Sequence, residues 1–286
     1  MAAPVEPQDQ PLAAYLAAHV EAAMEHLEEV PERTAIHQTR VALRRLRSTL
    51  RVFADLVELS EERLAWVDEE LSWFAGILGE VRDRQVQRAR FITVLAEIAP
   101  EDVAYEVVVR VATRIELLLL TEERAAATVV EETLVSERYR TLRALLEEWR
   151  VRPPVALTDS AKEHRRDVRT AAKAAAKKAD KRLAAAVKGI DDEALHRARK
   201  AAKRARYAAE VLRPLRSDDS EPQRSHYKGL QEVLGDFQDA VVARETIRRL
   251  AAAVDDTGSA FVLGLLYAQA ADQAAQSRHR ARALTR

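Results

Sequence analysis

Residues 37–53, HQTRVALRRLRSTLRVF, contain five arginines and no acidic residue, and their spacing decides the fold of this part of the chain. On a helix, five large apolar residues fall within one arc, which predicts a buried face. They are Ile36, Leu43, Leu46, Leu50 and Phe53. A row of arginines falls directly beside that arc rather than opposite it. The arginines of this row are Arg40, Arg44, Arg47 and Arg51.

A second stretch, HRARKAAKRARYAAEVL at residues 196–212, repeats this pattern with an offset of 159 residues. The offset pairs His37 with His196 and Arg44 with Lys203. Further along, ILGEVRDRQV (77–86) pairs with VLGDFQDAVV (233–242) at an offset of 156. Two matches in the same order indicate a duplicated helical unit, and we expect two bundles related by a pseudo-twofold axis.

The composition predicts an all-α protein. The 286 residues include only 7 glycines and 9 prolines, whereas Ala, Leu, Arg and Glu, the strongest helix formers, abound. We expect a helix break near Thr121 and bends at Gly76, Gly79 and Gly235. We expect helices at residues 12–29, 33–57, 61–97, 102–149, 160–187, 192–213, 222–254 and 259–283.

Proline positions set the expected domain boundaries. Residues 1–11 are expected to be a disordered tail, and the segment 151–158, with its Pro153-Pro154 pair, a linker between bundles. This gives a first bundle at 12–150 and a second at 159–286. Nothing before Leu12 is long enough for an attached enzyme domain, so we expect a stand-alone module.

Several classes of protein are excluded by composition. The absence of cysteine rules out disulfides, a thiolate nucleophile and Cys-based metal sites. No run approaches the roughly 18 apolar residues of a membrane helix, and no signal peptide is recognisable. We therefore expect a cytoplasmic protein that does not enter a membrane.

The formal net charge is zero, but the charges are unevenly distributed along the chain. Residues 55–149 hold 11 basic and 21 acidic side chains, whereas residues 162–213 hold 17 basic and 7 acidic ones. Such polarised segments indicate a directed electrostatic field.

The arginine row predicts a polyanionic partner. Like-charged pairs three or four residues apart each cost roughly 0.2–0.5 kcal/mol, and no acid among residues 33–54 relieves them. The row spans about 16 Å at about 1.5 Å per residue, which is longer than one phosphate needs. Residues 160–187 add a third basic arc, and a solvated helix face is the alternative for all three. The members of this arc included in the candidate site are Arg165, Arg169 and Lys173.

The two motifs, H-x-x-R-V-x-x-R-R-x-R from His37 and H-x-x-R-K-x-x-K-R-x-R-Y from His196, resemble the paired signatures of the CHAD family, the conserved-histidine α-helical domains. LGEVRD and LGDFQD resemble that family's pattern too. The resemblance covers the chain from about Leu12 onward. It implies two four-helix bundles around a basic central pore that binds inorganic polyphosphate, and an association with polyphosphate granules.

The resemblance implies site residues in both halves. In the first half these are His37, Arg40, Arg44, Arg45 and Arg47. In the second half they are His196, Arg199, Lys200, Lys203, Arg204 and Arg206. Arg51 joins them by its position in the arc alone. Its counterpart is Glu210, a departure from symmetry that predicts two unequal walls.

Catalysis and metal binding are not expected. The cations around His37 and His196 disfavour a metal ion, so these histidines are candidates for donating to phosphate oxygens or for a structural role. Asp83 and Asp239 lack an accompanying nucleophile or acid cluster, and we expect each to orient an arginine of a basic row. We predict no cofactor and no enzymatic activity.

Two other partners fit basic rows. Nucleic acid is disfavoured because aromatic residues make up only 5% of the chain and only Tyr207 lies within a row. An acidic protein surface, including the chain's own segment 55–149, is the other alternative. The sequence gives no indication of the oligomeric state.

Overall fold

The computed structural model describes residues 10–25, 33–98, 103–156, 160–188, 192–215 and 220–284. Within these ranges the regular structure is helical, and the only β pairing is an isolated bridge between Val57 and Val155. The all-α expectation is confirmed. The disordered tail expected at 1–11 falls mostly on residues 1–9, which lie outside the described ranges.

The α-helices lie close to their expected positions. They are α1 (Pro11–Met24), α2 (Arg33–Val52), α3 (Glu61–Ala96), α4 (Tyr105–Leu134), α5 (Glu137–Val151), α6 (Ala161–Lys188), α7 (Asp192–Val211), α8 (Ser220–Ala251) and α9 (Thr257–Ala283). Short 3-10 turns, η1 (Ala54–Leu56) and η2 (Arg213–Leu215), follow α2 and α7 at matching places.

The expected helix break near Thr121 is wrong, because α4 continues to Leu134. The chain breaks instead at Val135 and Ser136, and the Ser136 side chain accepts a hydrogen bond from the backbone N–H of Tyr139, which caps α5. Nothing at Thr121 stops a helix, since its hydroxyl simply bonds the carbonyl of Leu117. Gly76, Gly79 and Gly235 do not interrupt α3 or α8.

Contacts divide the chain into two compact units. Unit 1 comprises Met1–Gly79 and Val130–Gln231, and unit 2 comprises Glu80–Val129 and Glu232–Arg286. Each unit therefore combines segments from both sides of the expected linker. The division into bundles at 12–150 and 159–286 stays a prediction drawn from the duplication.

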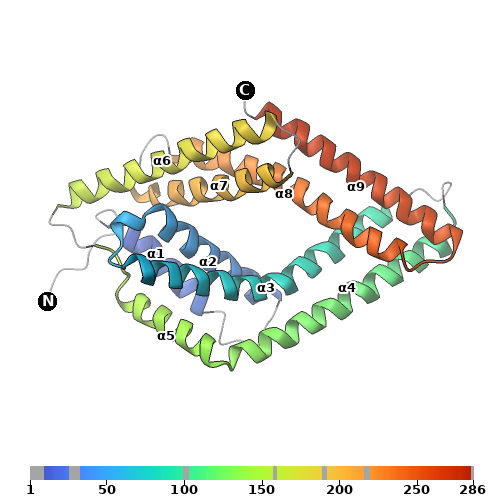
Figure 1. Cartoon of the computed structure of the whole chain (residues 1–286), viewed down its shortest axis with the longest axis horizontal. Helices are drawn as coiled ribbons and strands as arrows, with labels where there is room; N and C mark the ends of the chain where they lie inside the picture. The colour runs from blue at the N-terminus through green and yellow to red at the C-terminus, as the bar shows by residue number, and fades with distance from the viewer. Residues whose placement is uncertain are drawn as a thin grey trace. The chain divides into compact units, whose positions relative to one another are not determined.

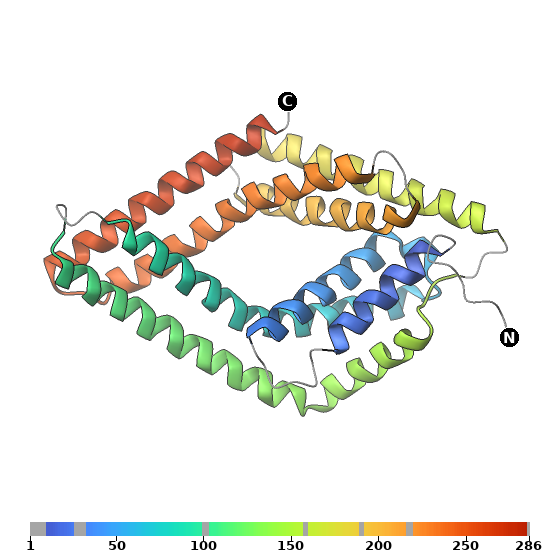
Figure 2. The same cartoon turned by 180° about the vertical axis from the view of Figure 1, so that it is seen from behind.

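Unit 1 holds the two duplicated basic helices. α1 packs against α2 and α5 (Figure 2), α6 lies along α7 (Figure 1), and α2 packs against both α7 and α6. The expected face of α2 is buried, with Leu43 and Leu46 fully inaccessible. The matching face of α7 is made largely of alanines, whose small side chains allow close helix packing. These alanines are Ala198, Ala201, Ala202, Ala205, Ala208 and Ala209.

The described part of the expected linker, residues 151–156, lies within unit 1. Its backbone is fixed by two hydrogen bonds, from the N–H of Glu58 to the carbonyl of Pro154 and from the N–H of Ala156 to the carbonyl of Leu56. Residues 157 and 158 lie outside the described ranges. The segment therefore holds the end of α5 beside η1.

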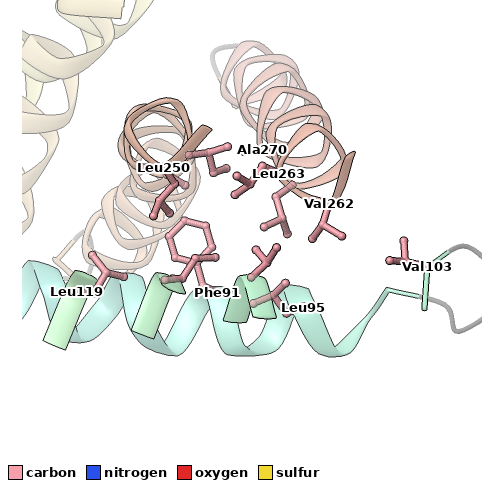
Figure 3. Close-up of a cluster of buried hydrophobic side chains, with 13 residues drawn as sticks. Phe91, Leu95, Val103, Leu119, Leu250, Val262, Leu263 and Ala270 are labelled. Atoms are coloured by element: carbon pink, nitrogen blue, oxygen red, sulfur yellow. The ribbon is translucent and has the colours of Figure 1, made fainter. Parts of the chain in front are cut away.

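Unit 2 has its own apolar core, formed by the ends of α3 and α8 with α4 and α9. The ring of Phe91 points toward the side chains of Leu250 and Leu263 (Figure 3), and all three are buried. Arginine–glutamate pairs flank this core, such as Arg88 with Glu116 and Glu123. None of the described helices is long and apolar enough to span a membrane.

Candidate functional site

The arginine row of α2 lies at the edge of the buried face, as its spacing predicts. Arg40, Arg44 and Arg47 are half-buried, and Arg51 is the most exposed member, with 38% of its side chain accessible. Side chains in this position run along the apolar surface and hold their charged ends beside it. The row therefore follows the wall of unit 1 rather than extending freely into water.

Asp68 of α3 binds two members of this row. Its oxygens accept hydrogen bonds from Nε and Nη2 of Arg47, at 3.0 and 3.2 Å, and from the same two nitrogens of Arg51. Burial acts to raise the pKa of Asp68, but the hydrogen bonds from Arg51 and Arg47 outweigh it and hold the pKa below its ordinary value. One carboxylate thus fixes the C-terminal end of the row.

Arg204 of α7 lies close to the same charges but lacks a counter-ion of its own. It forms no ion pair or hydrogen bond with another side chain in the described ranges. Burial, followed by the neighbouring Arg51, Arg182 and Arg47, lowers the pKa of Arg204, and only Asp68 opposes them. The end of the α2 row and the middle of α7 therefore share an excess of positive charge.

Glu210, which interrupts the symmetry of the two rows, organises the second one. It accepts hydrogen bonds from the hydroxyl of Tyr15 at 2.9 Å and from Nε of Arg206 at 3.1 Å, and Nη2 of Arg45 lies 3.5 Å away. Arg45 and Arg206 also face the ring of Tyr207, at 5.7 and 5.9 Å from its centroid. This one acid couples α1, α2 and α7.

Gly79, in the first LG element, lies against the guanidinium of Arg40. A Cβ at this position would be 3.0 Å from both Nε and Nη2 of Arg40. The absence of a side chain at Gly79 therefore gives Arg40 its place in the row.

Four other basic side chains of the candidate site form no ion pair with a residue in the described part of the chain. Arg44 on α2 and Lys200 on α7 form no ion pair with any described residue. On α6 the same holds for Arg169 and Lys173, while Arg165 is half-buried. Because α6 packs along α7 and contacts α2, unit 1 contains all three basic arcs.

The first histidines of the two motifs, His37 and His196, and the downstream aspartates have less defined roles. His37 is exposed near the start of α2, and His196 is half-buried on α7. Asp83 and Asp239 belong to unit 2, and their expected role in orienting arginines of the rows stays a prediction. Among the described residues no group of three or more His, Asp or Glu side chains is placed to hold a metal ion.

A pocket of about 770 Å³ opens at the C-terminal end of the α2 row. It lies between the end of α2, η1, α6 and α7, and all of its lining residues belong to unit 1. Arg51, Arg204 and Lys178 contribute positive charge to its lining. Its remaining walls are mostly alanines together with Phe53 and Leu56.

Comparison with known proteins identifies the family of this chain. The model of the CHAD domain matches residues 14–248. This chain belongs to the CHAD domain family. Two curated relatives from Mycobacterium tuberculosis, the uncharacterized proteins MT2285 of strain CDC 1551 and Rv2226 of strain H37Rv, are each 37% identical over 264 residues. The match covers 88% of this chain, which spans about half (47%) of either relative.

Solved structures agree with the CHAD fold. PptA from Streptomyces chartreusis superposes with a TM-score of 0.78 at 19% identity, covering 96% of this chain and 98% of that one. The CHAD domain from the plant Ricinus communis gives 0.72 at 24% identity, covering 100% and 94%. At these identities the likeness shows a shared fold.

Sequence reasoning missed three residues of the candidate site. Asp68 lies on a separate helix at no regular spacing from the row, Tyr15 carries no motif, and Lys178 lies outside the basic arc of α6 that includes Arg165, Arg169 and Lys173. The signal for Asp68 was the unpaired charge of the arginines that it binds, whereas nothing in the sequence indicated that Tyr15 donates to Glu210. His19 packs edge-on against the ring of Tyr15, with 4.3 Å between the ring centroids.

His19 predicts a pH dependence for the stability of the CHAD domain. Burial, aided by the nearby Arg45, lowers the pKa of His19 from 6.5 to about 4. The unfolded chain therefore takes up a proton below about pH 6.5 that the folded chain refuses, so stability falls as the pH falls from 6.5 towards 4. Urea unfolding should show that wild type loses on the order of 2 kcal/mol relative to His19→Gln over this range.

The same substitution at exposed His279 is the control for this measurement. His279→Gln should retain the wild-type pH dependence. Parallel stability curves for wild type and His19→Gln would contradict the structural position assigned to His19.

Proposed function

We propose that this CHAD domain binds inorganic polyphosphate along the basic rows of α2 and α7, as a binding module rather than an enzyme. The observation that carries the proposal is the packing of α2 against α7 within one unit, each with its cations beside its buried face. Two duplicated rows brought into one unit offer many donors to one extended anion. Arginine forks and lysine charges would grip successive phosphates without recognising any further feature.

The charge balance of the rows supports a polyanionic ligand. Asp68 forms ion pairs with Arg47 and Arg51, and Glu210 forms ion pairs with Arg45 and Arg206. Arg44, Lys200 and Arg204 form no ion pair within the described ranges. A chain of phosphates would supply these missing counter-ions. Its negative charges follow one another closely, as do the cations along each helix.

The family supports the same ligand. Members of the CHAD family, as the motifs imply, are associated with polyphosphate and its granules. We therefore propose the polyphosphate granule of the cytoplasm as the place where this protein acts. Nucleic acid fits the rows less well, since the aromatic ring within them, Tyr207, is only 4% exposed and offers no stacking surface.

Reversing the charge of one residue in each row tests the proposal. Arg44→Glu combined with Lys203→Glu should weaken binding of long-chain polyphosphate by at least about 100-fold, equivalent to about 2.8 kcal/mol, because repulsion replaces attraction in both rows. Calorimetric titration at several salt concentrations should also show a strong salt dependence for wild type and a smaller one for the variant.

A matched control makes the same two charge reversals at positions outside the basic rows. Arg124→Glu with Lys181→Glu alters two exposed cations, one on α4 and one on the solvated side of α6, and should change the affinity less than threefold. Equal binding of orthophosphate and long chains, or tighter binding of DNA in competition, would refute polyphosphate as the ligand. Undiminished binding by the Arg44 and Lys203 variant would refute the rows as the site.

The LG element provides a second, subtler test. Gly79→Ala places a methyl group against the guanidinium of Arg40 and displaces it. The affinity for polyphosphate should fall severalfold, while alanine's greater helix propensity keeps the domain at least as stable as wild type. Titration with long-chain polyphosphate and thermal unfolding measure the two effects.

Gly76→Ala on the same helix is the control, because no atom lies within 4 Å of its added Cβ. It should raise stability by about 0.5–1 kcal/mol and leave the affinity unchanged. Identical affinities for the two alanine variants would show that the position of Arg40 does not matter for binding.

A further inference from the structure

The pocket at the C-terminal end of the α2 row has features that a phosphate chain alone does not explain. Its volume of about 770 Å³ lies in the range of pockets that hold small organic ligands. Polyphosphate is charged along its whole length and gains nothing from an apolar wall. The pocket nevertheless has extensive apolar walls, as well as cations.

The apolar walls come from small side chains that leave room for a ligand. Ala171, Ala174 and Ala175 line the pocket from α6, and Ala201 faces them from α7. Phe53 and Leu56, at the end of α2 and in η1, complete this surface. An apolar molecular body of moderate size would remove this surface from water, which is favourable by about 25 cal/mol per Å².

The cations of the pocket come from three different segments. Arg51 lies at the end of α2, Lys178 on α6 and Arg204 on α7. Arg204 and Lys178 form no ion pair with a described residue, and Arg51 shares Asp68 with Arg47. The acids of the lining are Asp55 and Asp167, and Asp167 already accepts a hydrogen bond from Arg166 at 3.1 Å.

The lining favours an anionic head group with several oxygens. Its three cations, Arg51, Lys178 and Arg204, outnumber its two acids, and of these acids Asp167 is already paired with Arg166, while Asp55 offsets part of the positive charge. A phosphate monoester, which carries a charge of about −1.5 to −2 at neutral pH, offers three oxygens to cations from three segments, whereas a carboxylate offers only two. The forked guanidinium groups of Arg51 and Arg204 also suit the several oxygens of a phosphate.

We propose that this pocket, which shares Arg51 and Arg204 with the polyphosphate rows and extends beyond them along α6, is a second binding site for a small amphipathic phosphate monoester. The phosphate lies between Arg51, Arg204 and Lys178, and the apolar body lies against the alanines of α6 and the wall formed by Phe53 and Leu56. Because Arg51 and Arg204 also belong to the proposed polyphosphate site, occupancy of the pocket competes with the end of a bound phosphate chain.

The test uses a probe that combines the two parts of such a ligand. 1-Naphthyl phosphate has a phosphate head and an apolar body, inorganic phosphate has the head alone, and 1-naphthol has the body alone. Calorimetric titration of the full chain should give 1-naphthyl phosphate an affinity at least about 10-fold higher than either part, equivalent to about 1.4 kcal/mol. An affinity no higher than that of inorganic phosphate would overturn the proposal.

Variants outside the polyphosphate rows locate the probe. Ala174→Trp fills the pocket from an exposed position on α6 and should lower the affinity for 1-naphthyl phosphate at least about 10-fold. Ala184→Trp is also exposed on α6 but lies outside the pocket lining, so it should leave this affinity unchanged. Lys178→Gln should lower the affinity for 1-naphthyl phosphate severalfold, because it removes the positive charge of Lys178. An unchanged affinity in Ala174→Trp would place the probe elsewhere and contradict the site.

Polyphosphate titrations with the same variants separate this proposal from the proposed function. Ala174→Trp should bind long-chain polyphosphate within about twofold of wild type. If polyphosphate binds while 1-naphthyl phosphate does not, the pocket site fails and the function of the rows stands. If Ala174→Trp also abolishes polyphosphate binding, the pocket belongs to the polyphosphate path and the second site is refuted.

Discussion

The central constraint in this structure is that the positively charged arginines of α2 lie close together along the edge of its buried face. The burial of Leu43, Leu46 and Leu50 fixes the orientation of α2, so its arginines stay at the edge of the buried face. Asp68 pairs with Arg47 and Arg51, and Glu210 pairs with Arg45 and Arg206, whereas Arg44 forms no ion pair with a described residue. The unit is therefore held in a state in which additional negative charge is favourable, and this is the physical basis for binding a polyanion.

Small residues make this arrangement possible. The alanines of α7 allow close packing with its neighbours, so that its cations and those of α2 and α6 belong to one unit. Gly79 leaves the space that the Arg40 guanidinium occupies. The same use of small side chains on α6 and α7 leaves the pocket beside Arg204 open. The same small residues therefore determine both how the helices pack and where the cations lie.

The helices and the buried face of α2 were predictable, because apolar periodicity and helix-forming composition are local properties. The break between α4 and α5 was not, because a single serine cap at Ser136 outweighed the weaker signal read at Thr121. The basic rows could be read from spacing. Their partners on other helices could not, since Asp68 reaches Arg47 and Arg51, and Tyr15 reaches Glu210, only through tertiary packing.

Glu210 shows the limit of reasoning from the duplication. The offset identified it as the counterpart of Arg51 and predicted two unequal walls, which stays a prediction. The offset did not indicate that the Glu210 carboxylate binds Arg206 and lies near Arg45 in the folded unit. The two compact units likewise follow contacts rather than chain order, since both combine segments from the two repeats.

A crystal structure of the chain with a bound long-chain polyphosphate would show directly whether the basic rows of α2 and α7 bind one polyanion. We predict one phosphate chain whose oxygens lie within hydrogen-bonding distance of both Arg44 on α2 and Lys203 on α7. Phosphates bound only to the exposed lysines of α6, with neither Arg44 nor Lys203 in contact, would contradict it.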